Sequence, residues 1–582
     1  MAKSKQRSKK KLGDDPLAGL DMVGIDQEEE DLSIKALGHD PFDGMETKGI
    51  DIEQEDELFP LLAQQEMGEI GPEDALLSLA AQEGTGIAHD EIQIKPAVSH
   101  PGIPSLEQVL AAEIKPLVQI QPLEPLQAGY PADAVSGKIP LRPKATFHFP
   151  ADFKWGVATA AHQVEGNNIN NDWWAWEQQE GHIKEGHKSG LACNWWKETE
   201  TDFVPAAAMG INALRLSVEW SRIEPVPGEF DDSALERYSQ MLQSLRARNI
   251  EPMITLHHFT NPQWLAERGG WENPETIQHF ARFARRVVER LGQHCDLWCT
   301  INEPNVYGYL GYLEGTFPPG QTDLKAAMYV IRNLLAGHAA AYREIHAVQP
   351  NARVGLAHNM RILDPANPKS LLDRRVAQMT DRTYNQAIIT ALTRGRWMWP
   401  LGFGLAWKLR HTLDWIGLNY YTRDLVAFDR AQRQTLFSRR LHADDAELLD
   451  GGYGEFYPQG IFRCIKRLAR LNLPIYVTEN GIPDVDGDQR PRYLLTHLHQ
   501  MWHAIQLCYP VMGYYHWTLT DNFEWADGWT LRFGLLALDP ETQIRTPRPS
   551  ASLYTDIIQA NSITPQIIDT YAPELRAELL PG

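Results

Sequence analysis

DLWCTINEPN (296–305) is a short apolar run that ends abruptly in polar residues, Asn302 and Glu303. Seven similar runs lie on either side of it in the chain. They are FKWGVATA (153–160), INALRLSV (211–218), EPMITLHH (251–258), ARVGLAH (352–358), DWIGLN (414–419), PIYVTE (474–479) and VMGYYHW (511–517). Short apolar runs bounded by polar or turn residues are typical of strands buried on both faces. The sequence therefore predicts eight strands.

Amphipathic patterns with helical spacing lie between these strands, at Ser233–Asn249, Pro274–Leu291, Leu324–Val348 and Arg492–Cys508. Strands that alternate with helices predict an α/β fold, here a (β/α)8 TIM barrel with long loops. A doubly wound open sheet is the alternative, but no glycine-rich phosphate-binding turn follows the first strand. The segment from Arg361 to His411 is poorly patterned, so the loops around the fifth and sixth strands stay undefined.

Composition excludes several classes of protein. The formal net charge of -21 argues against a nucleic-acid binder, which needs basic surface. No apolar run is long enough to span a membrane, and the basic start MAKSKQRSKKK lacks the apolar segment of a secretory signal. The five cysteines lack metal-binding or redox spacing, which favours reduced, mostly buried thiols in a cytoplasmic protein. We therefore expect no metal and no cofactor.

Residues 1–146 differ in kind from the rest. They contain no Trp, one Tyr (Tyr130) and many charge clusters, so we expect a mostly disordered, acidic extension before a domain at 147–582. Short helices are predicted at Glu73–Gln82 and Ser105–Ile114. The segments 15–26 and 40–51 are identical at six of twelve positions. They are either low-complexity drift or a duplicated docking motif for a protein partner.

Polar residues follow the ends of the predicted strands. In a barrel of this type the carboxyl ends of the strands carry the chemistry. The residues there include Gln163, Arg215, His258, Asn302, Glu303, Asn419, Tyr421, Glu479 and Trp517. Glu303 and Glu479, after the fourth and seventh strands, are expected to face each other across the barrel mouth. Two carboxyl groups in different protonation states can hydrolyse a glycosidic bond. The charge of Arg215 would favour an ionised Glu479, whose charge would in turn raise the pKa of Glu303.

TINEPN (300–305) and YVTENGI (476–482) resemble the acid/base and nucleophile signatures of glycoside hydrolase family 1. Four more segments extend the resemblance from about residue 150 to the end: FKWGVATAAHQVEG (153–166), LRLSVEWSRIEP (214–225), GLNYYT (417–422) and WTLTDNFEWADGW (517–529). VEWSRIEP and GTFPPG (315–320) are most similar to the archaeal and thermophile-type β-glycosidases of that family.

The resemblance implies a role for each matched residue. Glu479 would be the nucleophile of a retaining β-glycosidase and Glu303 its acid/base, with support from Arg215, Tyr421 and Asn302. The substrate-binding residues would be Gln163, His258, Asn419, Glu524 and Trp525, with Trp517 beneath the sugar and a cis peptide between Trp517 and Thr518. The charge of Glu524 would repel a phosphate, which favours unphosphorylated β-glucosides or β-galactosides as substrates.

Two other functions use the same residues, a transglycosylase and a non-catalytic sugar-binding scaffold. The stretch His257-His258-Phe259-Thr260 departs from the family pattern, in which Trp follows the histidine. Metal binding by His257 and His258 is disfavoured, because successive strand side chains face opposite ways. Glycone and aglycone preference, the oligomeric state (a homo-oligomer included) and the partner of the extension are left open.

Overall fold

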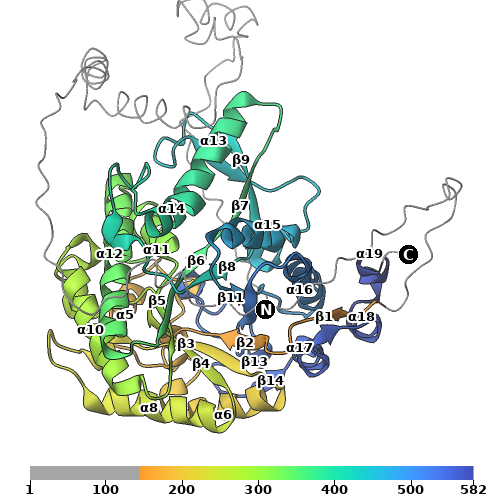
Figure 1. Ribbon diagram of the computed structural model, residues 1–582, viewed down its shortest axis with the longest axis horizontal. Helices are drawn as coiled ribbons and strands as arrows, with labels where there is room; N and C mark the ends of the chain where they lie inside the picture. Colours follow the sequence, from red (N-terminus) through yellow and green to blue (C-terminus); the bar gives the residue numbers. More distant parts are fainter. Residues whose placement is uncertain (1–144, 581–582) are drawn as a thin grey trace, which may run out of the picture. The chain divides into compact units, whose positions relative to one another are not determined.

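The computed structural model describes residues 145–580. Nearly all of the expected extension, with its two predicted helices and its similar segments, lies outside the described residues. The eight predicted strands form a closed, parallel barrel (Figure 1) in the order β11-β12-β2-β3-β4-β5-β6-β8. Their bounds are β2 (Lys154–Ala158), β3 (Ala213–Ser217), β4 (Glu251–His257), β5 (Leu297–Asn302), β6 (Arg353–Asn359), β8 (Trp415–Asn419), β11 (Ile475–Asn480) and β12 (Val511–Trp517). The (β/α)8 prediction is confirmed.

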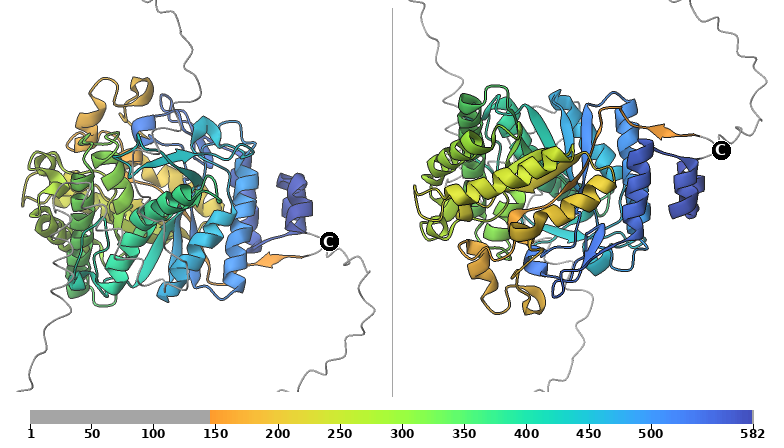
Figure 2. Two further views of the ribbon diagram at one scale, coloured as in Figure 1. Left: turned by 90° about the horizontal axis from the view of Figure 1, so that it is seen from above. Right: turned by 90° about the horizontal axis from the view of Figure 1, so that it is seen from below.

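Helices cover the outside of the barrel (Figures 1 and 2). The long ones are α6 (Trp195–Ala208), α8 (Asp232–Ala247), α10 (Thr276–Leu291), α12 (Leu324–Val348), α15 (Gln459–Leu468), α16 (Arg490–Gln506) and α17 (Pro549–Ala560). Asp231 caps α8 and Asp323 caps α12, each accepting hydrogen bonds from two backbone N–H groups of the first turn. In α10, Phe280, Ala284, Val287 and Leu291 form a buried apolar stripe at helical spacing. The four predicted helices are confirmed within two residues at each end.

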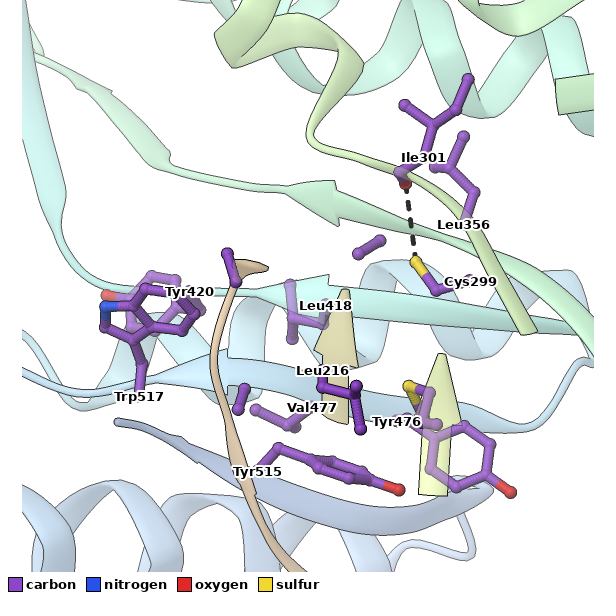
Figure 3. Close-up of a cluster of buried hydrophobic side chains, with 14 of the residues drawn as sticks. Leu216, Cys299, Ile301, Leu356, Leu418, Tyr420, Tyr476, Val477, Tyr515 and Trp517 are labelled. Carbon is purple, nitrogen blue, oxygen red and sulfur yellow. Dashed lines mark hydrogen bonds between the residues drawn. The ribbon is translucent and has the colours of Figure 1, made fainter. Parts of the chain in front are cut away.

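The core fills the barrel and the space beneath its helices. Figure 3 shows side chains from several barrel strands in one apolar cluster, among them Leu216, Cys299, Ile301, Leu356, Leu418, Tyr476, Val477, Tyr515 and Trp517. The packing is close enough to exclude a single methyl group. A Cβ on Gly156 would lie 2.5 Å from the ring of Tyr515, so this strand position needs glycine.

Additional elements stand beside the carboxyl ends of β6 and β8. β7 (Ile362–Pro365), β9 (Arg423–Phe428) and β10 (Ser438–Leu441) form a small sheet in the order β10-β9-β7. α13 (Leu371–Asp381), a π-helical turn η3 (Arg382–Gln386) and α14 (Ala387–Arg394) follow β7. This is the region that the sequence left undefined. It supplies a rigid wall next to β6.

Shorter elements complete the described chain. Two strand pairs lie outside the barrel, β1 (Phe147–His148) with β15 (Ser562–Ile563), and β13 (Leu536–Leu538) with β14 (Arg545–Pro547). Short helices include α4 (Ala161–Val164), α5 (Asp172–Glu177), α7 (Trp220–Ile223), α9 (Gln263–Ala266), α11 (Pro304–Tyr312), α18 (Pro565–Tyr571) and α19 (Arg576–Leu579). Among the described helices, none has both the length and the apolar character that a membrane span requires.

Candidate active site

Glu303 lies where β5 ends and α11 begins. Its backbone is left-handed, with φ 45° and ψ 62°, a conformation that costs a residue with a side chain about 1–3 kcal/mol. The chain holds it there from both sides. The Glu303 amide donates to the carbonyl of Ala357 on β6 at 2.8 Å, and the Glu303 carbonyl accepts from the amide of Tyr307 at 3.0 Å. Pro304 at the first helical position has the φ that a helix start needs.

The carboxyl group of Glu303 is buried among neutral donors. The side-chain amides of Asn359 and Asn419 both donate to Oε1, each at 2.8 Å. Burial and, to a lesser extent, the charge of Glu479 raise the pKa of Glu303 to about 8 against the lowering effect of the two amides. The carboxyl is therefore mostly protonated at neutral pH. The rise has the expected direction, and burial contributes more to it than the charge of Glu479, which was the cause expected from the sequence.

Glu479 has a different environment at the end of β11. The Arg215 guanidinium donates to its Oε1, and the Tyr421 hydroxyl donates to its Oε2 at 2.6 Å. Arginine is permanently charged, and charge-assisted donors favour a carboxylate. Burial raises the pKa of Tyr421 well above its usual range, so the phenol stays a donor.

Asn302 and Asn419 connect the two glutamates. Arg215 donates to Asn302 Oδ1 at 2.7 Å, and the Asn419 amide donates to the same oxygen at 3.1 Å as well as to Glu303. Asn419 is also the register partner of Glu479 between β8 and β11. One network of hydrogen bonds thus joins both carboxylates.

The remaining predicted residues lie together in a cluster beside this pair. Gln163 donates to Glu524 Oε2 at 3.0 Å. The His258 ring lies nearly parallel to Trp517, with centroids 5.9 Å apart, and to Trp525, with centroids 6.0 Å apart. The structure therefore brings all of the predicted site residues into one region.

Two polar atoms of this cluster have no hydrogen-bond partner among the residues that the structure describes. Gln163 Oε1 and His258 Nδ1 are buried, and neither makes a hydrogen bond within the described residues. Asn302 Nδ2 donates to His258 Nε2 at 3.1 Å, which leaves Nδ1 of a neutral imidazole as a donor. Burial lowers the pKa of His258 well below its usual value. An acceptor and a donor thus remain for a polyhydroxylated ligand.

The ionisation state of Glu524 differs from the one expected from the sequence. Burial, together with the neighbouring charges of Asp527 and Glu479, raises the pKa of Glu524 to about 8 against the lowering effect of hydrogen bonds from Gln163 and Trp517. The carboxyl is thus mostly protonated at neutral pH. Its repulsion of a phosphate is weaker than the sequence suggested, although it still accepts hydrogen bonds.

The two adjacent histidines face different partners, as expected. His257 contacts Asn261 and Trp271, whereas His258 contacts Asn302. Phe259, which replaces the family's Trp, packs edge-on against Trp525 at 5.3 Å. The peptide between Trp517 and Thr518 is cis, as the resemblance implied.

One acidic group among the described residues has the spacing of a cation site, formed by Asp450, Asp484 and Asp486. Both carboxylate oxygens of Asp484 already accept backbone N–H groups, from Gly487 at 2.8 Å and Arg490 at 2.7 Å. These bonds explain the geometry of the loop without an ion.

Sequence reasoning missed three residues near the carboxylates. Asn359 ends β6 as Asn302 ends β5, and that shared position was a usable signal. Tyr384 lies in the π-helical turn and donates to Asn359, for which the sequence has no pattern. Tyr453 lies in the loop before α15. Burial raises the pKa of Tyr453, and Glu524, Glu303 and Glu479 contribute to that rise.

The family model described as glycosyl hydrolase family 1 matches residues 145–563. A β-galactosidase of Pyrococcus woesei is 32% identical, and the alignment covers 72% of this chain and 98% of that protein. β-Glucosidase A of Thermotoga maritima is 31% identical over 71% of this chain and 98% of its own length.

Solved structures agree with these relatives. The β-glycosidase from Pyrococcus horikoshii superimposes with a TM-score of 0.69 at 35% identity, covering 74% of this chain and 100% of that one. The Thermotoga maritima β-glucosidase in complex with glucoimidazole gives a TM-score of 0.68 at 30% identity, covering 72% of this chain and 100% of that one.

Proposed function

Because the chain belongs to glycosyl hydrolase family 1, we propose that it hydrolyses terminal, unphosphorylated β-glucosides and β-galactosides with retention of configuration. Glu479 acts as the nucleophile, and Glu303 acts as the general acid and then the general base. The enzyme class rests on the family. The residue roles rest on the site geometry described above.

The difference between the two carboxyl groups carries the proposal. Glu479 is bound by a guanidinium and a phenol, which favours its charged form. Glu303 is bound only by amides, and burial raises its pKa to about 8. One ionised and one protonated carboxyl group are what double displacement requires at neutral pH.

The reaction then proceeds in two steps. Glu303 gives its proton to the glycosidic oxygen while Glu479 bonds to the anomeric carbon, which forms a glycosyl-enzyme and releases the aglycone. The charge of Glu479 is thereby lost, and the pKa of Glu303 falls because that charge had raised it. The ionised Glu303 can then take a proton from water, which attacks the same carbon and frees Glu479. We expect a carboxylate separation of about 5–5.5 Å.

The pocket beside the carboxylates supports a neutral sugar. Gln163 Oε1, His258 Nδ1 and the Glu524 carboxyl offer acceptors and a donor for the outer hydroxyls. Trp517 offers an aromatic face beneath the ring. The relatives named β-galactosidase and β-glucosidase support both glycones, and they include archaeal and thermophile proteins, as the segment VEWSRIEP suggested.

Chemical rescue tests the assignment of the two glutamates. Glu479→Gly is expected to abolish hydrolysis of an aryl β-glycoside, and azide should restore turnover with a product of inverted configuration. Glu303→Ala with azide should give a product of retained configuration, because azide intercepts the glycosyl-enzyme from the face opposite Glu479. Identical stereochemistry from both variants would show that the roles are assigned wrongly.

The extension is proposed to lie outside the catalytic domain, which we place at 147–582. It carries none of the site residues, and its similar segments 15–26 and 40–51 are suited to a protein partner. All five cysteines are free thiols, four of them buried, which supports a reducing, cytoplasmic location. Cell fractionation and affinity capture with residues 1–146 test these two points.

A further inference from the structure

The π-helical turn η3 lies against the strand end that contacts Glu303. The Tyr384 hydroxyl donates to Asn359 Oδ1 at 2.8 Å. Asn305 donates to the backbone carbonyls of both Asn359, at 2.9 Å, and Tyr384, at 3.3 Å. The turn is therefore attached to the end of β6 by a side chain and through the backbone.

A second contact fixes the chain on the other side of Asn359. The Arg361 amide donates to Asn385 Oδ1 at 3.2 Å, and the Asn385 side chain donates back to the Arg361 carbonyl at 2.9 Å. Tyr384 is 4% exposed. Its hydroxyl thus has one fixed position, and π-helical turns of this kind often occur at functional sites.

The direction of the Asn359 amide follows from these contacts. A primary amide has an accepting oxygen and a donating nitrogen. Burial raises the pKa of Tyr384, so its phenol remains a donor and selects the amide oxygen. The amide nitrogen must then face Glu303 Oε1. The opposite orientation would place two oxygens against each other at Glu303 and leave the phenol without its acceptor.

The two oxygens of Glu303 consequently differ. Oε1 accepts N–H groups from both Asn359 and Asn419, whereas Oε2 accepts no hydrogen bond from the described part of the chain. An oxygen that accepts two donors is a poor place for the acidic proton. Oε2 is therefore the oxygen that the acidic proton favours.

We propose that Tyr384 is a positioning residue. It orients the Asn359 amide so that Glu303 Oε1 accepts hydrogen bonds from Asn359 and Asn419, while the proton of Glu303 stays on Oε2. The inference rests on the proposed role of Glu303 as acid and base. It adds a residue from a turn outside the barrel that acts through Asn359 and does not touch the substrate.

The expected effect is on the ionisation of Glu303. The charged and titratable groups that face this carboxyl are Glu479 of β11, Arg215 of β3, Tyr421 after β8, Tyr453 before α15 and Tyr384 itself. The amides of Asn359 and Asn419 lower the pKa of Glu303. Loss of one of these donors therefore raises that pKa, and it slows the second step, in which Glu303 must be ionised.

Tyr384→Phe in the full chain tests the proposal. The high-pH limb of kcat/KM for an aryl β-glycoside should shift upward, and kcat for a substrate with a good leaving group should fall about 2- to 10-fold at neutral pH. Tyr309→Phe is the matched control. The Tyr309 ring packs edge-on against Tyr384, with ring centroids 5.3 Å apart. The Tyr309 hydroxyl makes no hydrogen bond to Asn359 or Glu303.

A double variant separates positioning from general loosening of the wall. Because Tyr384 acts through Asn359, Tyr384→Phe should have little further effect in an Asn359→Ala background. Asn359→Ala alone should shift the limb in the same direction, which keeps the test valid if Tyr384→Phe folds poorly. The proposal would be overturned if the pH profiles of the wild type and both single variants were superimposable. An equal shift in Tyr309→Phe, or additive effects of Tyr384→Phe and Asn359→Ala in the double variant, would overturn it as well. Failure of the proposed function would instead appear as an active Glu303→Ala variant.

Discussion

Removal of one hydroxyl, in Tyr421→Phe, measures how much the proposed nucleophile, Glu479, depends on its neutral donor. The Tyr421 hydroxyl donates to Glu479 Oε2 at 2.6 Å in a buried site. A hydrogen bond to a charged group is worth about 1.5–3 kcal/mol, and about 1.4 kcal/mol corresponds to a tenfold change in rate. Without this bond Glu479 is held less firmly against the anomeric carbon, and loss of the full bond energy in the transition state would lower kcat/KM about 10- to 150-fold.

The neighbouring tyrosine supplies the control. The Tyr420 hydroxyl is also buried and donates at 2.6 Å, but to the backbone carbonyl of Tyr457, away from both carboxylates. Tyr420→Phe makes the same chemical change and should lower the melting temperature without a comparable loss of kcat/KM. Steady-state kinetics with an aryl β-glycoside and thermal unfolding of both variants decide the matter. A kcat/KM for Tyr421→Phe within twofold of the wild type, or an equal loss in Tyr420→Phe, would refute the reasoning.

Four further outcomes are expected. The pKa of Glu303 near 8 predicts that kcat/KM falls as pH rises through about 8. Between the ordinary value of 4.5 and about 8 the folded chain binds more protons than the unfolded chain, so the free energy of unfolding should fall as pH rises. Glu303→Gln should flatten that fall, and denaturant titrations across this range measure it. Glu524→Ser should lower kcat/KM on unphosphorylated glycosides by about several-fold to a hundredfold, and an unchanged value would remove Glu524 from the pocket. A chain beginning at Arg142 should keep nearly the same melting temperature and kcat, whereas a large drop in melting temperature would mean that the extension stabilises the barrel.

The barrel could be predicted from the sequence because burial of a strand on both faces requires a short run of apolar residues. Each strand is a short apolar run, and the helix Leu324–Val348 was predicted with the bounds that the structure has. Glu303 and Glu479 were readable because they immediately follow such runs. Tyr384 was not, because its role depends on a hydrogen bond to Asn359, 25 residues away in the chain. The protonation of Glu524 was also hidden, since it depends on burial that no single segment encodes.

The left-handed backbone of Glu303 has a consequence for protein engineering. Glycine adopts this conformation without penalty, and asparagine tolerates it better than glutamate does. A screen that selects only for heat resistance would therefore favour replacement of Glu303, which the proposed mechanism needs as its acid and base. Stability and the proposed activity conflict at this position, so libraries that include residue 303 need both readouts.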